Sequence, residues 1–186
     1  MDKYSQKRQN SLAERLKAGD HTAAAELVDI YYDQIYLFMR RLGHGRQESF
    51  DLTQDTFLQA WRHIAQLRNS TALNAWLYRI AGNTSKLYWR RHRFARPTSI
   101  EDLDVPDSSQ PDNDRIERIE QLDHLKNAIA KLSEKSRQAV VLHYMQHLTI
   151  AEAAEAAGIG QNAFKGRLSR ALKALRNQIG SQNGGP

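Results

Sequence analysis

The stretch HLTIAEAAEAAGIGQNAFKGRLSRALKALRN, residues 147–177, decides the class of fold predicted for this chain. Thr149 is followed three residues later by Glu152, the spacing of a helix capping box. The alanine-rich segment that follows ends at Gly158, a residue type that favours helix C-termini. The second half of the stretch places apolar residues on one helical face and basic residues on the other. Two short helices joined by a glycine turn, the second of them basic, indicate a helix-turn-helix unit.

The second helix of such a unit lies in the major groove of duplex DNA and reads bases with residues near its N-terminus. Three polar residues stand at that head: Gln161, Asn162 and Lys165. Basic residues farther along are better placed for phosphates: Arg167, Arg170, Lys173 and Arg176. A bare backbone at Gly166 would permit close approach to DNA or to a neighbouring helix. The alternative interpretation is an ordinary amphipathic helix with a solvated basic face.

Charge is distributed unevenly along the 186 residues. The net charge is +6 and the isoelectric point is near 9.6, which favours a polyanionic partner. The chain has no cysteine, no signal-peptide pattern at its start and no apolar run of transmembrane length, so we expect a soluble intracellular protein. A proline-containing segment, Glu101–Asp114, carries six acidic residues and no basic ones. Such a segment cannot bury enough apolar surface to fold alone, and it predicts a linker.

The periodicity of apolar residues predicts an all-α chain of two helical domains. Before the linker it indicates a short helix near Ser11–Ala18 and longer ones at Ala23–Leu42, about Glu48–Ala65, and Ala72–Arg93. After the linker it indicates a helix ending near Lys131, a helix capped by Ser133, and the helix-turn-helix. The expected divisions are a domain at 1–95, a flexible acidic linker at 96–114, a domain at 115–179 and a disordered tail at 180–186.

The segment Lys86–Arg96, KLYWRRHRFAR, interleaves three aromatic residues with five basic ones. Aromatic rings can stack on unpaired bases while cations follow the backbone, an arrangement typical of single-strand binding. The alternative is a core helix whose basic end is merely solvated.

Two motif blocks resemble one known family. DLTQDTFLQAWRHI, residues 51–64, and AWLYRIAGNTSKLYWRRHR, residues 75–93, resemble region 2 of the extracytoplasmic-function (ECF) sigma factors of bacterial RNA polymerase, in the sigma-70 family. LSEKSRQAVVLHYMQHLTIAEAAEAAGIGQNAFKGRLSRALKAL, residues 132–175, resembles their region 4. The resemblance implies a transcription initiation factor that directs core polymerase to promoters through −35 duplex recognition and −10 strand opening. It also implies binding of the polymerase β′ coiled coil and β flap, control by an anti-sigma factor, and a place in the bacterial cytoplasm.

The resemblance assigns roles to individual residues. Core polymerase binding falls on Asp51, Leu52, Gln54, Asp55, Phe57, Leu58 and Trp61, although Phe57 and Trp61 are equally well explained as core residues. Contacts with the −10 element fall on Arg68, Asn69, Ser70, Asn74, Arg79, Asn83, Lys86, Tyr88, Trp89 and Arg90. Contacts with the −35 element fall on Lys165, Gly166, Ser169 and Arg170, beside Gln161, Asn162, Arg167 and Lys173.

Some positions depart from the family pattern. Gly166 stands where a small hydroxyl residue is common, Asn162, Ala163 and Phe164 replace Gly-Thr-Val, and Phe50 replaces an acidic residue. The departures near Gly166 affect the expected −35 sequence preference and leave the expected fold unchanged.

Other classes of protein explain the sequence less completely. A conventional helix-turn-helix regulator with a helical sensing domain accounts for the C-terminal half but leaves the Asp51 helix and the basic aromatic segment without a role. An enzyme is not expected, because no phosphate-binding glycine loop or nucleophile elbow is present. His143 and His147 stand four residues apart but lack a third ligand, so we expect no metal and no cofactor.

Overall fold

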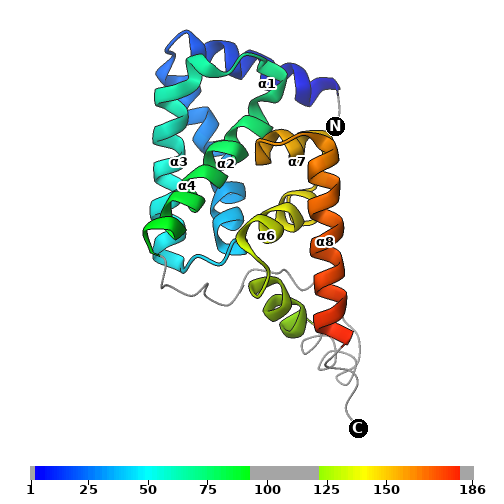
Figure 1. Cartoon of the computed structure of the whole chain (residues 1–186). Coiled ribbons are helices and arrows are strands. Elements are labelled where there is room, and N and C mark those ends of the chain that lie inside the picture. The colour runs from blue at the N-terminus through cyan, green and yellow to red at the C-terminus, as the bar shows by residue number, and fades with distance from the viewer. Residues whose placement is uncertain (1–2, 93–121, 181–186) are drawn as a thin grey trace, which may run out of the picture.

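The computed structural model describes residues 3–92 and 122–180, and every regular element in these two ranges is helical (Figure 1). The prediction of an all-α fold is therefore confirmed. The expected linker at 96–114 lies outside the described residues, as does the tail after residue 180.

Four long helices and two short 3-10 turns form the N-terminal unit. In chain order they are α1 (Lys3–Lys17), α2 (His21–Arg41), α3 (Arg46–His63), η1 (Ile64–Gln66), η2 (Ser70–Ala72) and α4 (Leu73–Arg91). Asp20 begins α2, because its Oδ1 accepts hydrogen bonds from the backbone N–H of Thr22 at 2.8 Å and of Ala23 at 3.3 Å. The first helix is longer than the sequence indicated, and the other three agree with it closely.

The C-terminal unit begins, within the described residues, with a helix over residues 122–130. It continues with α6 (Glu134–Val140), a π-helical turn η3 (Val141–Met145), α7 (Ile150–Ala157) and α8 (Gln161–Gly180). Ser133 caps α6 as predicted, because its Oγ accepts from the backbone N–H of Ser136 at 3.4 Å. The apolar face of α8 is buried: Phe164 is 0% and Ala171 1% exposed.

The two units pack against each other, with α4 lying along α7 (Figure 1). Three hydrogen bonds cross the boundary: Arg137 Nη1 donates to the Leu42 carbonyl at 2.7 Å, Arg41 Nη1 to the Met145 carbonyl at 2.9 Å, and the Tyr78 hydroxyl to Gln146 Oε1 at 2.7 Å.

Gly82 of α4 leaves room for the side chain of Gln138 on α6. A Cβ added at Gly82 would lie 2.2 Å from Gln138 Nε2, so any larger residue there would displace the glutamine side chain. Buried apolar residues from both units join in one core, so the docked arrangement is a packed interface.

Candidate nucleic-acid and polymerase interfaces

The α7–turn–α8 segment has the geometry that its sequence predicts. The Glu152 carboxylate accepts from the Thr149 backbone N–H at 2.9 Å, and Thr149 Oγ1 accepts from the Glu152 backbone N–H at 3.3 Å, which completes the capping box. Gly158 ends α7 in the left-handed conformation with φ of 67°, where a side chain would be strained. Local sequence therefore fixes both ends of the first helix of this helix-turn-helix.

The outer face of α8 is polar, basic and accessible. The exposed residues include Gln161, Asn162, Lys165, Gly166, Ser169, Arg170 and Lys173, and Arg167 is half-buried. Residues 161–180 include five Lys and Arg residues and no Asp or Glu, so the helix carries no carboxylate of its own beside its cations. Nothing lies within 4 Å of a Cβ added at Gly166. Close packing against a neighbouring helix is therefore not the reason for a glycine at this position.

The loop before α4 is ordered by its own polar side chains. Asn69 Oδ1 accepts from the Thr71 backbone N–H at 3.0 Å and from the Thr71 hydroxyl at 2.8 Å, and so begins the turn η2. Arg68 and Asn69 are exposed at this loop. The carboxamide oxygen of Asn69 thus has a structural partner, and its amino group is the part left for a ligand.

Helix α1 supports this loop, a role that sequence reasoning missed. The Ser70 hydroxyl donates to the Glu14 carboxylate, and the Lys17 ammonium donates to Ser70 Oγ at 3.2 Å. The same ammonium lies 3.2 Å from Glu14. Glu14 and Lys17 are distant from Ser70 in the sequence, so no local sequence pattern indicates that they contact this loop.

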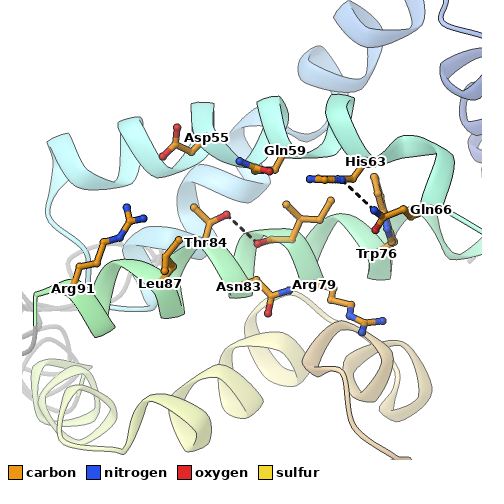
Figure 2. Close-up of a pocket in the computed structure, with 11 residues that line it drawn as sticks. Asp55, Gln59, His63, Gln66, Trp76, Arg79, Asn83, Thr84, Leu87 and Arg91 are labelled. Carbon is orange, nitrogen blue, oxygen red and sulfur yellow. Dashed lines mark hydrogen bonds between the residues drawn. The ribbon is translucent and has the colours of Figure 1, made fainter.

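A groove of about 620 Å³ runs between α3 and α4 (Figure 2). Its lining combines apolar side chains of α4 with polar side chains of both helices: Asp55, Gln59, His63, Gln66, Trp76, Arg79, Ile80, Asn83, Thr84, Leu87 and Arg91. Asp55, expected at the polymerase interface, and Arg79 and Asn83, expected at the −10 strand, thus border the same groove, although Arg79 and Asn83 project from the side of α4 that faces away from α3 (Figure 2). The exposed Arg79 also lies next to the helix-turn-helix, since a Cβ added at Gly158 would be 3.7 Å from Arg79 Nε.

Residues 86–91 of the basic aromatic segment form the C-terminal end of α4, and its last residues, 93–96, lie outside the described residues. Lys86 and Arg90 are exposed, whereas Tyr88 and Trp89 are half-buried. Both aromatic rings contact His44, a buried residue of the loop between α2 and α3. Sequence reasoning did not identify His44, because no local periodicity connects it with α4. The remaining −10 candidate, Asn74, is half-buried, and its Oδ1 is a buried atom without a hydrogen-bond partner.

The predicted polymerase stripe lies along α3. Asp51, Gln54 and Asp55 are exposed, and Leu58 beside them is 54% exposed. Leu52, also expected at this surface, is only 6% exposed and packs in the core of the unit. The helical period turns its side chain about 100° away from that of Asp51, toward the side of α3 that carries the buried Thr56 and Ala60.

Aromatic residues flank this stripe. Phe57 and Trp61 are half-buried and pack against the core, in line with the alternative interpretation of both. Phe50 is 43% exposed and borders a groove of about 400 Å³ with Tyr32 and Tyr36. A large exposed apolar side chain next to Asp51 is suited to an interface with another protein.

The histidine pair does not form a metal site in the structure. His143 Nδ1 lies 2.8 Å from the Leu148 carbonyl, a contact within the polypeptide. Over residues 3–92 and 122–180, no three histidine, aspartate or glutamate side chains are grouped to hold a metal ion. In the same ranges, none of the helices combines the length and hydropathy that a bilayer-spanning segment needs.

Comparison with known proteins matches each of the two units to a family model. Residues 27–95 match the family model of sigma-70 region 2, and residues 122–175 match that of sigma-70 region 4. The ECF RNA polymerase sigma factor SigW of Bacillus subtilis strain 168 is 31% identical over 178 residues, which cover 89% of this chain and 93% of SigW. The ECF RNA polymerase sigma factor SigM of Mycobacterium tuberculosis H37Rv is 30% identical over 169 residues, covering 90% of this chain and 83% of SigM.

Solved structures share the fold. CnrH in complex with the cytosolic domain of CnrY is similar over 93% of this chain and 97% of the matched chain, with a TM-score of 0.69 and 25% identity. The sigma factor RpoE of Bartonella quintana, solved with the anti-sigma factor NepR, covers 83% of this chain and 95% of its own, with a TM-score of 0.58 and 23% identity. The latter likeness shows the fold alone.

Proposed function

The chain belongs to the extracytoplasmic-function sigma factors of bacterial RNA polymerase, and from this premise we propose how its two units divide the recognition of a promoter. As an RNA polymerase sigma factor it directs the core enzyme to promoters. The polymerase makes the RNA, and this chain contributes recognition without catalysis of its own.

The C-terminal unit reads the −35 element as duplex DNA. Gln161, Asn162 and Lys165 face base edges from the head of α8, and Arg167, Ser169, Arg170 and Lys173 contact the backbone around Gly166. The observation that supports this assignment is the exposed, carboxylate-free face of α8 behind a correctly capped α7. Phosphate contacts position the helix, and the few base contacts specify the sequence.

The N-terminal unit opens and holds the −10 element. Arg68, Asn69, Ser70 and Asn74 surround an unstacked base at the loop before α4. Arg79, Asn83, Lys86, Tyr88, Trp89 and Arg90 then follow the single strand along α4. The preordered loop supports this assignment, since a loop already in place loses less conformational entropy on binding.

The core enzyme docks on α3 through its β′ coiled coil. The exposed set Asp51, Gln54, Asp55 and Leu58 carries the contact, and the half-buried Trp61 contributes at its margin. The C-terminal unit binds the β flap. Acidic side chains around an apolar one suit a basic, partly apolar partner surface.

The chain is organised as a region 2 domain at 1–95, an acidic linker at 96–114, which lies outside the described residues, a region 4 domain at 115–179 and a short tail. It acts in the bacterial cytoplasm, where its polymerase is. An anti-sigma factor holds it inactive, a proposal supported by family membership and by the likeness to CnrH, which was solved with the cytosolic domain of CnrY.

Mapping of transcript 5′ ends tests the function directly. Purified chain is mixed with bacterial core polymerase and genomic DNA, and the starts are compared with those of core alone. We expect discrete starts that need this chain and share a −35 and −10 pair. Failure to bind core, together with tight duplex binding by the chain alone, would instead establish the conventional regulator.

A further inference from the structure

His44 belongs to the loop between α2 and α3, and its buried side chain packs against the second half of α4. Its side chain is 1% exposed. Its ring stacks on Trp89, with centroids 4.6 Å apart and planes inclined by 18°. It also meets Tyr88 edge to face at 4.9 Å, and its Nε2 shares a 2.8 Å hydrogen bond with Ser85 Oγ. One imidazole therefore touches three side chains on the second half of α4.

The backbone of His44 is itself held in place. Its N–H donates to the Met39 carbonyl at 3.3 Å, and its carbonyl accepts from Arg40 Nη1 at 2.8 Å. The Ser49 hydroxyl lies 3.4 Å from the same carbonyl. Because the neighbouring helices fix the loop, the imidazole offers a fixed surface to the indole of Trp89.

Tyr88 and Trp89 are supported differently. Tyr88 packs against the core and stacks on His92, with centroids 4.2 Å apart and planes inclined by 22°. Trp89 has His44 against its ring and remains half-buried, so part of the indole is open to solvent between the exposed Lys86 and Arg90. An aromatic ring beside cations on one helix is suited to stack on a base while the cations meet phosphates.

An indole that is already stacked on a fixed ring has fewer rotamers to lose when it binds a base. The stack also joins two uncharged rings, because burial, with the nearby Arg137 as a second cause, lowers the pKa of His44 to about 3. The imidazole therefore supports the indole without adding a charge beside the strand.

We propose that His44 is a positioning residue for promoter opening, and that its imidazole holds Trp89 in the orientation in which the indole stacks on an unpaired base of the −10 strand. The proposal rests on the proposed function, because it takes Trp89 to contact that strand. His44 itself does not touch the DNA.

Three substitutions of His44 separate its ring from its hydrogen bond. His44→Phe keeps a stacking ring and loses the bond to Ser85, His44→Gln keeps a polar group without a ring, and His44→Ala loses both. Trp89→Ala tests the premise, and His124→Ala is the control at an exposed histidine of the C-terminal unit. Each variant is assembled with core polymerase on a promoter found by transcript mapping. Polymerase affinity, closed-complex affinity and permanganate reactivity of the −10 thymines are then measured.

We expect His44→Gln and His44→Ala to slow opening about tenfold, within the range of one base-stacking contact, with polymerase and closed-complex affinities unchanged. His44→Phe should stay within about twofold of the unchanged chain, since the stacked ring is retained. In the free full-length chain, the indole N–H signal of Trp89 should shift in His44→Gln and keep its position in His124→Ala.

Other outcomes would overturn the proposal. Equal slowing by His44→Phe and His44→Gln would show that stacking is not what His44 contributes. Normal opening in His44→Gln together with slow opening in Trp89→Ala would exclude the positioning role of His44 and leave the proposed function intact. Normal opening in Trp89→Ala would exclude the proposed roles of both His44 and Trp89. The proposals on polymerase binding and −35 recognition would be unaffected. If His44→Ala fails to fold, the Phe and Gln pair decides alone.

Discussion

Single buried polar residues carry many of the contacts that join distant parts of this chain. His44 and Arg137 are 1% and 4% exposed, and the Glu134 carboxylate is near enough to Arg137 to favour its charged form. Arg137 donates to the Ile129, Ala130 and Leu132 carbonyls in its own unit, in addition to Leu42 in the other. A buried cation is tolerated because carbonyl oxygens surround it.

The burial of His44 makes stability depend on pH. Its pKa is lowered from 6.5 to about 3 in the folded chain, so between these values the unfolded state binds the extra proton. The free energy of unfolding therefore falls as pH drops below about 6.5, and the loss at pH 5 is about 2 kcal/mol. Arg137 of α6 and the Tyr88 phenol face the same ring and stay protonated throughout this range. Urea unfolding at pH 7 and pH 5 measures the loss.

His44→Phe should remove most of this pH dependence, whereas His124→Ala should keep it. An unchanged difference between pH 7 and pH 5 in His44→Phe would mean that another group is responsible.

Lys165 is the residue at the head of α8 with the clearest predicted role. Lys165→Ala should weaken binding of the holoenzyme to −35 DNA about tenfold, because one base or phosphate contact is lost, and should leave polymerase affinity unchanged. Fluorescence anisotropy with labelled promoter and with labelled core measures the two affinities. Lys135→Ala is the matched control, because Lys135 is also exposed and lies on α6. Equal loss of both affinities would contradict the assigned role.

At the scale of an element, α3 serves two surfaces at once. Leu52, Thr53, Thr56 and Ala60 are buried against the rest of the unit, while Asp51, Gln54, Asp55 and Leu58 face outward. The helical period separates the two sets, so the outer face can change without disturbing the core.

Reversing the charge of the outer face of α3 should therefore abolish polymerase binding and preserve the fold. We expect Asp51→Arg with Asp55→Arg to lower core affinity at least about tenfold, because like charges meet across the interface. The free energy of unfolding should change by about 0.5 kcal/mol or less per site, since both side chains are exposed. Core affinity and circular dichroism are measured on the double variant and on Asp29→Arg, an exposed control on α2. Unchanged core affinity would exclude this face.

At the scale of the whole molecule, the docked arrangement sets α4 against the helix-turn-helix. The names of the two promoter elements place them about 25 base pairs apart, which is roughly 85 Å of B-form DNA at 3.4 Å a step. On the proposed assignment of α4 to the −10 element and α8 to the −35 element, we expect promoter binding to require that the two units separate.

Arg137 should control how tightly the units dock. Arg137→Met removes the bond to Leu42 and three bonds inside the C-terminal unit, and should lower the free energy of unfolding by about 2 kcal/mol. It should also increase the radius of gyration in small-angle X-ray scattering, because one of the hydrogen bonds across the boundary is lost. Lys135→Met is the control. An unchanged radius of gyration would show that the bond from Arg137 to Leu42 is not needed to hold the units together.

The sequence by itself determined the helical class, the positions of most helices and the chemistry of the DNA-reading helix. These are local properties: the capping box at Thr149, the glycine at Gly158 and the period of apolar residues in α8 all act within a few residues. Motif likeness was enough to identify the family, since both motif blocks are continuous in the chain. The exposed carboxylates of α3 followed from the same period.

Tertiary structure alone decided the rest. It brought His44 against Trp89, Glu14 and Lys17 against Ser70, and Arg137 against the end of α2, and it buried Leu52 in the core. Each of these joins residues from different elements, and no local period records which face of one element will meet which face of another. The physical reason is that burial and close packing depend on the whole chain, whereas caps and helical periods depend only on neighbours.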